Sequence, residues 1–449
     1  MKYEEYKDSG MSWVGDVPIN WQRKRIKFLC SNSSAGIWGE EEKGDVNDIV
    51  CFRIADFDYQ RGYLCFDKLT FRNIQSKDLN GRTLTENSLL IEKSGGGEVT
   101  PVGRVVRYNY GDKATCSNFI HFITINKLYN RDFLYYYFYA LYANKENLLY
   151  FNQTTGIQNL KIGEYLGQSI FLPSFTEQQA IATYLDKKCE EINHAIDVQK
   201  KKIDLLGELK QTIITDAVTK GLNPNAPMKD SGVEWIGEVP DHWKVMKLNF
   251  ACKKITDFVA SGSFADLRNN VTYLDEPDYA MLVRTADLSG KDKSIAKVYV
   301  SKHSYKFLSN SNLFGGEVIL PNIGASIGDV YIVPEHIYEK ATLGPNSIML
   351  ISKTDNNFLY YLFCSKRWRE ALIILGQAAA QCKFNKTEVR GLKVIIPPIT
   401  EQRTIVAHIE KKVTKIDSQI TKANRRIELL EELKQSIITE AVTGKIKVC

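Results

Sequence analysis

The most constraining feature of this 449-residue chain is that it repeats itself. Residues 7–30 realign without a gap on residues 229–252, and 11 of the 24 positions are identical. A second ungapped match joins residues 173–220 to residues 397–444, with 22 identities in 48 positions. Shared composition does not keep register over such lengths, so we infer an internal duplication. The chain is therefore one unit of roughly 225 residues used twice, and not the three domains that its length alone suggests.

The middle of each copy has diverged. Short echoes remain, such as FRIAD at 52–56 and VRTAD at 283–287, but their offsets drift between 225 and 231 residues. One scaffold that carries two different binding surfaces would show this pattern, and so would neutral drift of loops. Stretches rich in β-branched residues alternate here with Gly, Asn and Pro, which predicts strands joined by turns. Aromatic runs at 133–138 and 358–363 predict a helix that packs on those strands.

Each copy ends in a long helix with a heptad seam. Mostly apolar residues recur at steps of three and four through 185–206, and the second copy repeats the register through 409–430. The pattern predicts helices at 176–220 and 400–443; at about 1.5 Å per residue the first spans roughly 67 Å. Each helix could pack only on its own domain, but pairing of the two explains their length better and is the arrangement we expect. The order domain, helix, domain, helix makes such a pair antiparallel.

The expected fold class is therefore α+β. We predict two domains in a pseudo-two-fold tandem repeat, joined by two long antiparallel coiled-coil helices. The domains are placed at 1–172 and 223–396, and the helical segments at 173–222 and 397–449.

No catalytic constellation is found in the sequence. The six histidines make no metal-ligand spacing, and GGGEVTPVG, starting at residue 95, lacks the ending of a phosphate-binding loop. We predict no catalytic residue and no metal site. The nine cysteines form no CxxC pair, which fits reduced thiols. A net charge of +6 permits a nucleic-acid partner without requiring one. Because no run of 18 apolar residues occurs, we expect no membrane segment and a cytoplasmic protein.

Several short motifs occur in order along the two halves. WVGDVPINW and WIGEVPDHW open them, TTGIQNL (154–160) precedes the first helix, and NIGASIG (322–328) lies in the second half. LPSFTEQQAIATYLD and PPITEQRTIVAHIE, followed by LLGELKQTIITDAVT and LLEELKQSIITEAVT, complete the set. Over essentially the whole chain, these motifs resemble the specificity subunits of type I restriction–modification systems.

The resemblance implies that each variable domain is a target-recognition domain that reads one half of a bipartite double-stranded DNA sequence. It also implies that the helices set the half-site spacing and dock two copies of an adenine-N6 methyltransferase subunit, and that restriction/translocase subunits join the assembly. The chain itself would be non-catalytic and would hold no cofactor; S-adenosylmethionine, ATP and Mg²⁺ would belong to the partner subunits. One departure is GQAAAQCKFNK (376–386), which stands where the first half has TTGIQNLK and predicts a differently built loop.

Candidate DNA-binding residues follow from the chemistry of recognition. Phosphate contacts need Lys, Arg or small polar groups, and base readout needs Arg, Lys, Asn, Gln or Ser on loops. The candidates in the first domain are Arg53, Lys93, Ser94, Arg104, Thr154, Thr155, Gln158, Asn159 and Lys161. Those in the second are Arg284, Asn322, Ser326, Gln377, Gln381, Lys383, Asn385 and Lys386. Gln158 and Gln381 differ between the copies and are the better base readers. Arg53 and Arg284 recur, so they are expected to hold phosphate or internal carboxylates.

Two other interpretations fit parts of the sequence. The first is a coiled-coil scaffold whose end domains bind proteins or glycans, for which DNA binding would be weak and insensitive to salt. The second is an enzyme with a dispersed site. The duplication argues against the enzyme, because chemistry rarely needs two diverged copies.

Overall fold

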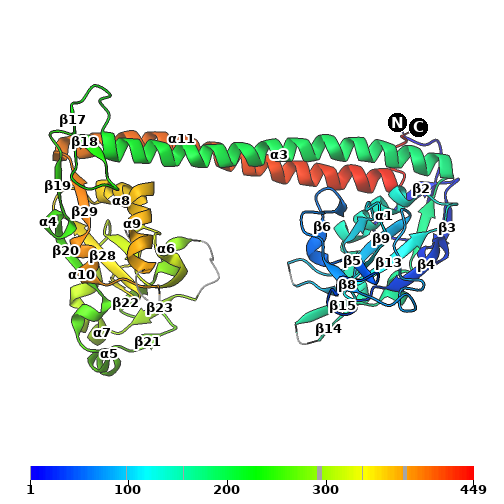
Figure 1. Cartoon of the computed structure of the whole chain (residues 1–449), viewed down its shortest axis with the longest axis horizontal. Helices are drawn as coiled ribbons and strands as arrows, with labels where there is room; N and C mark the ends of the chain where they lie inside the picture. Colours follow the sequence, from blue (N-terminus) through cyan, green and yellow to red (C-terminus); the bar gives the residue numbers. More distant parts are fainter. Residues whose placement is uncertain are drawn as a thin grey trace. The chain divides into compact units, whose positions relative to one another are not determined.

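The computed structural model describes residues 2–97, 99–154, 156–290, 296–335, 337–377 and 382–448. They form two compact units, and the division between them falls inside both long helices. The first unit comprises the residues up to Lys201 together with those from Ala423 onward, and the second comprises Lys202–Lys422. Figure 1 shows the elements of each unit in chain order.

The first domain is built on a six-stranded sheet that separates two cores. Its strands lie in the order β4 (Cys30–Ala35), β13 (Ile120–Ile125), β9 (Ser88–Glu92), β11 (Val105–Arg107), β7 (Tyr63–Leu64) and β6 (Phe57–Asp58). Successive side chains of a strand point to opposite faces. Leu89 and Ile91 of β9 therefore enter a core with α1 (Arg131–Ala143), while Leu90 enters the other core. A second sheet closes that other core, with strands in the order β12 (Ala114–Cys116), β5 (Asp48–Phe52) and β8 (Phe71–Asn73).

The second domain repeats this plan around a four-stranded sheet. Its strands lie in the order β20 (Cys252–Asp257), β28 (Ser347–Ser352), β25 (Val318–Pro321) and β26 (Tyr331–Ile332). Val318 and Leu320 face a core with α8 (Asn356–Cys364) and α9 (Lys366–Gln377), and Ile319 faces the opposite side. A five-stranded sheet covers that side, in the order β21 (Tyr273–Leu274), β23 (Val298–Val300), β22 (Ala280–Val283), β27 (Ala341–Leu343) and β24 (Asn312–Leu313). Its short helices include α5 (Phe264–Asn270), α6 (Thr285–Ser289) and α7 (Lys302–Phe307).

The repeated motif at the start of each half forms the same structure twice. Trp21 and Trp243, each 1% exposed, meet Phe133 of α1 and Phe358 of α8 edge to face, with ring centroids 6.4 Å apart in both copies. Such a pair fixes the position of the aromatic helix, which explains why the motif is retained. The matched hairpins are β1 (Tyr6–Asp8) with β2 (Asp16–Pro18) and β17 (Met228–Asp230) with β18 (Glu238–Pro240). The matched closing pairs are β3 (Gln22–Arg25) with β16 (Ser169–Leu172) and β19 (Lys244–Lys247) with β29 (Lys393–Ile396).

The two long helices are α3 (Phe175–Lys220) and α11 (Ile399–Val442), whose ends lie within one residue of the predicted ones. Every predicted seam position is buried or half-buried. The retained TEQ motif has a local reason. Its glutamines, Gln178 and Gln402, are buried and donate an amide N–H to the carbonyl oxygens of Pro173 and Pro397.

Within each unit the two long helices lie antiparallel. In the first unit the beginning of α3 lies beside the end of α11, and Lys434 Nζ donates to Asn193 Oδ1 at 3.0 Å (Figure 1). In the second unit the end of α3 lies beside the beginning of α11, and Lys210 Nζ is 2.7 Å from Asp417 Oδ1. The predicted pairing is confirmed. Residues of both helices also belong to the hydrophobic cores of the domains. Packing of the helices on the domains therefore accompanies their pairing with each other.

The described part of the chain contains no group of three or more His, Cys, Asp or Glu side chains placed to hold a metal ion. Its eight cysteines are free thiols. None of the helices that the structure describes is long and apolar enough to cross a bilayer.

Candidate nucleic-acid interface

In the first domain, two motifs distant in sequence form one small sheet. β10 (Ser94–Gly95) pairs with β15 (Ile157–Leu160), which pairs with β14 (Phe151–Thr154). Ser94 lies opposite Asn159, and its hydroxyl donates to Asn159 Oδ1 at 2.7 Å. The β14–β15 hairpin lies on the side of the domain away from α3 (Figure 1). The structure therefore brings Ser94, Gln158 and Asn159 together, on strands and not on the loops that we expected.

Gln158 is the residue that holds the neighbouring glycine-rich loop. Its side chain is 3% exposed; Oε1 accepts from the main-chain N–H of Val102 at 3.1 Å, and Nε2 donates to the carbonyl oxygen of Gly97 at 3.4 Å. Gly96 has a φ of +66°, and a Cβ there would lie 2.8 Å from the Val102 nitrogen. Only glycine fits that close approach. The Gln158 amide is thus occupied within the domain in this structure.

The hairpin carries exposed polar side chains on both of its faces, and two of them, Asn152 and Gln153, were not singled out by the sequence. Asn152 lies opposite Asn159 in the strand register, and Gln153 follows it; all three are exposed. Asn and Gln side chains can bond two positions of an adenine edge. The available signal was proximity: Asn152 and Gln153 immediately precede the TTGIQNL motif and share its hairpin.

Arg53 and Arg284 hold internal carboxylates, one of the two roles expected of them. The Arg53 guanidinium donates to Asp56 Oδ1 at 2.9 Å, and its main-chain N–H donates to Asp56 Oδ2 at 2.7 Å. Arg284 and Asp287 repeat this arrangement at 3.0 and 2.8 Å. The hydrogen bond to the carboxylate raises the pKa of each arginine. The recurring FRIAD and VRTAD motifs are therefore helix-capping turns.

The remaining candidates of the first domain flank the hairpin sheet. Arg104 Nε donates to Glu92 at 2.9 Å, and its guanidinium lies 3.7 Å from the centre of the Tyr59 ring, so its charge is used internally. Lys93 is half-buried at the end of β9, and Lys161 is 3.7 Å from Glu164 in a surface ion pair of little energetic weight. Thr154 ends β14, and Thr155 lies outside the described residues.

In the second domain, Asn322 is joined to the segment that precedes α10 (Lys386–Gly391). The main-chain N–H of Phe384 donates to the Asn322 carbonyl oxygen at 3.1 Å, and Asn322 Nδ2 donates to the Phe384 carbonyl oxygen at 2.8 Å. Lys383 is exposed beside it, in an antiparallel bridge with Ile323. Two of the predicted residues, Asn322 and Lys383, are thus brought together.

The same main-chain bond occurs in the first domain, where the N–H of Leu160 donates to the carbonyl oxygen of Lys93 at 2.8 Å. The elements next to this hydrogen bond differ between the two domains. The first domain has the β14–β15 hairpin, whereas the second has α9, which continues to the exposed Gln377. The predicted difference between TTGIQNLK and GQAAAQCKFNK is therefore found in the structure, although Gln381 lies outside the described residues.

Three further candidates of the second domain have local partners. Asn385 caps α10 by accepting from the main-chain N–H of Glu388 at 3.1 Å. Lys386 Nζ donates to Asp257 at 2.8 Å. Ser326 is half-buried in the short helix Gly324–Ser326, where its carbonyl oxygen accepts from Asp329.

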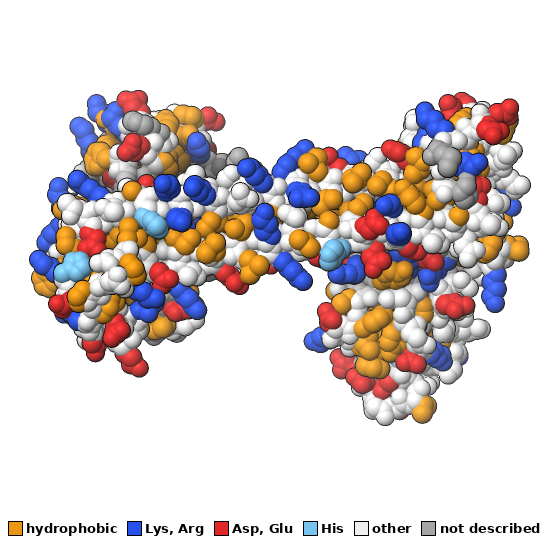
Figure 2. Space-filling model, turned by 90° about the horizontal axis from the view of Figure 1, so that it is seen from above, with side chains coloured by type: hydrophobic (Ala, Val, Ile, Leu, Met, Phe, Trp, Pro, Cys, Tyr) orange, Lys and Arg blue, Asp and Glu red, His pale blue; other side chains and the backbone are white. Residues whose placement is uncertain are grey.

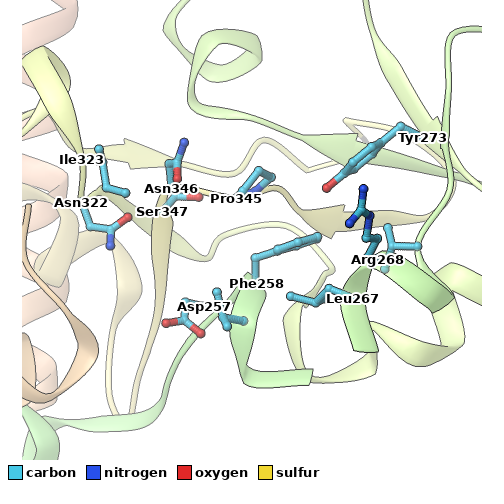
Figure 3. Close-up of a pocket in the computed structure, with 12 residues that line it drawn as sticks. Asp257, Phe258, Leu267, Arg268, Tyr273, Asn322, Ile323, Pro345, Asn346 and Ser347 are labelled. Carbon is cyan, nitrogen blue, oxygen red and sulfur yellow. The ribbon is translucent and has the colours of Figure 1, made fainter. Parts of the chain in front are cut away.

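A groove of 530 Å³ in the second domain adds residues that sequence reasoning missed. Figure 3 shows Asn322 and Asn346 toward one end of the groove and Arg268 and Tyr273 at the other. Asn322 Oδ1 is buried without a hydrogen-bond partner among the described residues. An arginine, an aromatic ring and amides are groups that contact phosphates and bases. Arg268 lies on α5, outside every motif of the sequence, so no pattern could have selected it.

Comparison with known proteins finds a match to each half of the chain. The family model described as type I restriction modification DNA specificity domain matches residues 18–202 and again residues 240–431. A protein of Methanocaldococcus jannaschii, provisionally named as the type I restriction enzyme MjaX specificity subunit, is 23% identical over 447 residues, which is 97% of this chain and 96% of its own. The type I restriction enzyme MjaVIII specificity subunit of the same organism is 26% identical over 326 residues, 70% of each chain.

Solved structures show the same fold. A chain from work on complex assembly and conformational transition of the type I R-M system has a TM-score of 0.68 at 15% identity, covering 96% of this chain and 99% of its own. The HsdS subunit from Thermoanaerobacter tengcongensis has a TM-score of 0.50 at 15% identity, covering 99% and 100%. None of these matches supports a scaffold for proteins or glycans. With both of its halves matched by one family model, the chain belongs to the type I restriction–modification DNA specificity family.

Proposed function

We propose that the chain reads a bipartite duplex DNA target, one half with each variable domain. The supporting observation is that one scaffold carries two different exposed structures at the same place. The Lys93–Leu160 bond of the first domain and the Asn322–Phe384 bond of the second fix equivalent positions, from which a hairpin and a helix end respectively project. Different side chains on a common frame are what two different half-sites require.

The chemistry of the exposed residues suits this role. Asn152, Gln153 and Asn159 offer amides for base edges on the hairpin, and Lys383 and Arg268 offer cations for phosphates or guanines in the second domain. A two-stranded ribbon is narrow enough to enter the major groove. Arg53, Arg104 and Arg284 are expected to contribute indirectly, because their guanidinium groups hold carboxylates of their own domain.

The partners that we propose are two adenine-N6 methyltransferase subunits and the restriction/translocase subunits. Exposed leucines on the long helices support two identical docking sites. Leu205 and Leu209 of α3 are 64% and 48% exposed, and their counterparts 224 residues later, Leu429 and Leu433 of α11, are both 47% exposed. Exposed apolar residues retained in both copies favour one protein bound twice. On the side of the molecule seen in Figure 2, apolar side chains lie among lysines and arginines along the long helices.

In this proposal the chain supplies recognition and no catalytic group. Adenine methylation and ATP-dependent cleavage belong to the assembled complex, and S-adenosylmethionine, ATP and Mg²⁺ bind in the partner subunits.

A domain exchange tests the bipartite reading. Residues 31–170 are replaced by the corresponding domain of a relative, and the full chain, with any subunits that copurify, selects binders from a pool of random duplexes that are then sequenced. We expect only one half of the recovered sequence to change. The reciprocal control exchanges residues 253–390 and should change only the other half. A change in both halves, or in neither, would contradict the proposal.

A further inference from the structure

The turn that connects β6 to β7 in the first domain reaches both long helices. Its centre is Gln60, whose carbonyl oxygen accepts from Asn193 Nδ2 of α3 at 3.1 Å and from Lys434 Nζ of α11 at 2.6 Å. The Gln60 side chain donates to Asp197 at 2.9 Å and accepts from Lys200 at 2.7 Å. We call these four interactions the Gln60 contact. One residue of the domain thus binds two helices through both its main chain and its side chain.

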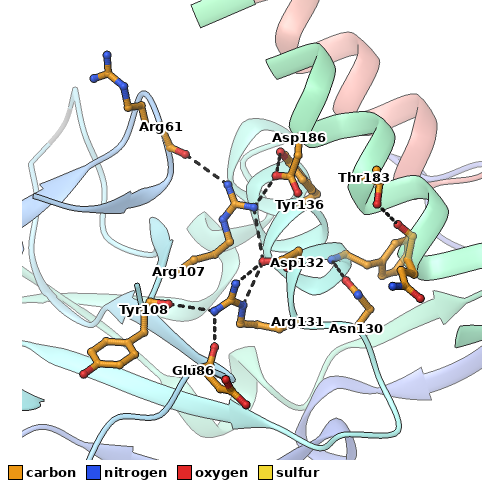
Figure 4. Close-up of polar contacts among 12 residues, drawn as sticks. Arg61, Glu86, Arg107, Tyr108, Asn130, Arg131, Asp132, Tyr136, Thr183 and Asp186 are labelled. Carbon is orange, nitrogen blue, oxygen red and sulfur yellow. Dashed lines mark hydrogen bonds and ion pairs between the residues drawn. The ribbon is translucent and has the colours of Figure 1, made fainter. Parts of the chain in front are cut away.

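A buried arginine, Arg107, also holds the turn. Arg107 is 2% exposed; it donates to the carbonyl oxygen of Arg61 at 3.4 Å and to Asp186 of α3 at 2.6 Å (Figure 4). Its guanidinium lies against the rings of Tyr63 and Tyr135, at 3.9 and 4.3 Å. Stacking and a charged hydrogen bond together hold the turn at a fixed place over α3.

The turn itself allows little adjustment. Gly62 has a φ of +74°, which favours glycine, and a Cβ there would lie 1.9 Å from the Tyr135 hydroxyl oxygen. Its N–H donates to the Asp58 carbonyl oxygen at 2.7 Å. The conformation that presents Gln60 to the helices is therefore set by the packing of the domain.

Burial of the Lys434 ammonium costs free energy of hydration. Lys434 is 6% exposed, and its hydrogen bonds go to a carbonyl oxygen and to Asn193 Oδ1, neither of them a charged group. Burial lowers its pKa. A buried ammonium without a bonded carboxylate gives up hydration for directional bonds, so its contribution is to geometry more than to stability.

Of the four helix residues of the Gln60 contact, only the lysine is repeated in the second copy. At an offset of 224, Asn193, Asp197 and Lys200 correspond to Asp417, Thr421 and Asn424. Lys434 corresponds to Lys210, which forms an exposed ion pair with Asp417 at 2.7 Å. The positions that bind the Gln60 side chain have therefore changed between the copies, whereas the lysine and the position of its partner on the other helix recur.

The strand registers show the same difference for the buried arginine. Arg107 pairs with Leu89 of β9, and its counterpart in β26 is Ile332, which pairs with Val318 of β25. In the described residues of the second unit, the hydrogen bonds between α3 and the domain are Gln211 to the Cys364 carbonyl oxygen and the Lys366 N–H to Thr215.

We propose that the turn Asp58–Gly62 is a positioning element that fixes the first domain on the long helices and thereby restricts the DNA spacer length that the chain accepts. This rests on the bipartite reading proposed above. Adding one base pair between half-sites turns the second by about 35° around the duplex axis, since a helical turn holds about 10 base pairs. A domain held at a fixed angle rejects that rotation, and a domain free to rock tolerates it.

The test uses three variants of the full chain in the same selection from random duplexes. Gln60→Ala removes the two side-chain bonds at a half-buried position. Lys434→Met keeps the length of the buried side chain and removes the ammonium. Lys210→Met is the matched control at the repeated position, where the ion pair is exposed. Thermal unfolding shows which variants fold. If Lys434→Met does not fold, Gln60→Ala alone tests the proposal.

We expect Gln60→Ala and Lys434→Met to recover the same two half-site sequences as the wild type with a broader range of spacers. The preference for the wild-type spacer over one a base pair longer or shorter should fall at least ~5-fold. Lys210→Met should leave that preference unchanged. The proposal is overturned if the folded variants keep the wild-type preference, if they lose binding or change a half-site sequence, or if Lys210→Met broadens the spacers equally. A wild type that selects no bipartite sequence would instead refute the bipartite reading itself.

Discussion

His121 is a histidine placed inside the central sheet of the first domain. It lies on β13, is 9% exposed, and its Nε2 is 2.8 Å from the Ser33 hydroxyl oxygen. Burial, with a smaller contribution from the charge of Lys93, lowers its pKa from 6.5 to about 4. The strand registers place Ile348 at this position in the second domain, so the effect belongs to the first unit.

The stability of the first unit should therefore depend on pH between about 4 and 6.5. The folded state favours the neutral imidazole, so the unfolded chain binds more protons in this range. The stabilisation is fully present above pH 6.5 and is lost as the pH falls toward 4, by at most about 3 kcal/mol. Thermal unfolding of the wild type and of His121→Gln, followed from pH 7 to pH 4, measures it. The variant should show a flatter dependence; equal slopes would assign the acid sensitivity to other groups.

At the scale of single residues, the sequence predicted chemistry better than position. Arg53 and Arg284 were expected to hold phosphate or carboxylates because they recur, and they hold Asp56 and Asp287. Gln158 was selected because it differs between the copies, yet its amide bonds Val102 and Gly97 inside the domain. A residue can differ between the copies because the local structure has changed or because the bound ligand has changed. The sequence difference alone could not separate these two causes.

The long helices were the most predictable elements. A seam of seven positions per copy and the absence of proline define them locally, and the structure places their ends within one residue of prediction. The β14–β15 hairpin was not predicted. Its strands have four residues each, and β15 pairs not only with β14 but also with β10, about 60 residues earlier in the chain. Such non-local pairing leaves no periodic signal in one sequence.

Substitutions on the helices test the two proposed docking sites. Leu205→Lys with Leu209→Lys places charge on the exposed face of α3, and Leu429→Lys with Leu433→Lys does the same on α11. Because these leucines contribute little to either core, the chain should stay folded. Each double variant should copurify with one methyltransferase subunit in place of two, and the quadruple variant with none. Native mass spectrometry gives the stoichiometry. Retention of both subunits by the quadruple variant would show that the partners bind elsewhere.

At the scale of the whole chain, the duplication allows both long helices to be lengthened by the same number of residues at equivalent positions. A heptad copied after Lys201 in α3, and its counterpart copied after Arg425 in α11, preserve the seam of both helices. Neither insertion touches Asn193, Asp197, Lys200 or Lys434 of the Gln60 contact.

This paired insertion should lengthen the accepted DNA spacer. Seven helical residues add roughly 10 Å, which is about three base pairs of duplex at ~3.4 Å each. Three base pairs also turn the second half-site by roughly 105°, so the insertion is combined with Gln60→Ala, which frees the first domain to follow that rotation. Sequencing of selected duplexes should then recover the original half-sites separated by the longer spacer. An insertion in α3 alone breaks the match with α11 and serves as the control, with weaker binding expected. An unchanged spacer in the paired variant would remove the helices from the control of spacing.

The Gln60 contact also bears on how such chains acquire new specificities. A gene segment that encodes a foreign first domain must bring a turn with a compatible glutamine, or land in a chain whose helices carry other side chains at 193, 197, 200 and 434. Recombination within this lineage is therefore expected to move a first domain together with the helix residues that hold its turn, and chains that combine a foreign turn with unmatched helices should be rare.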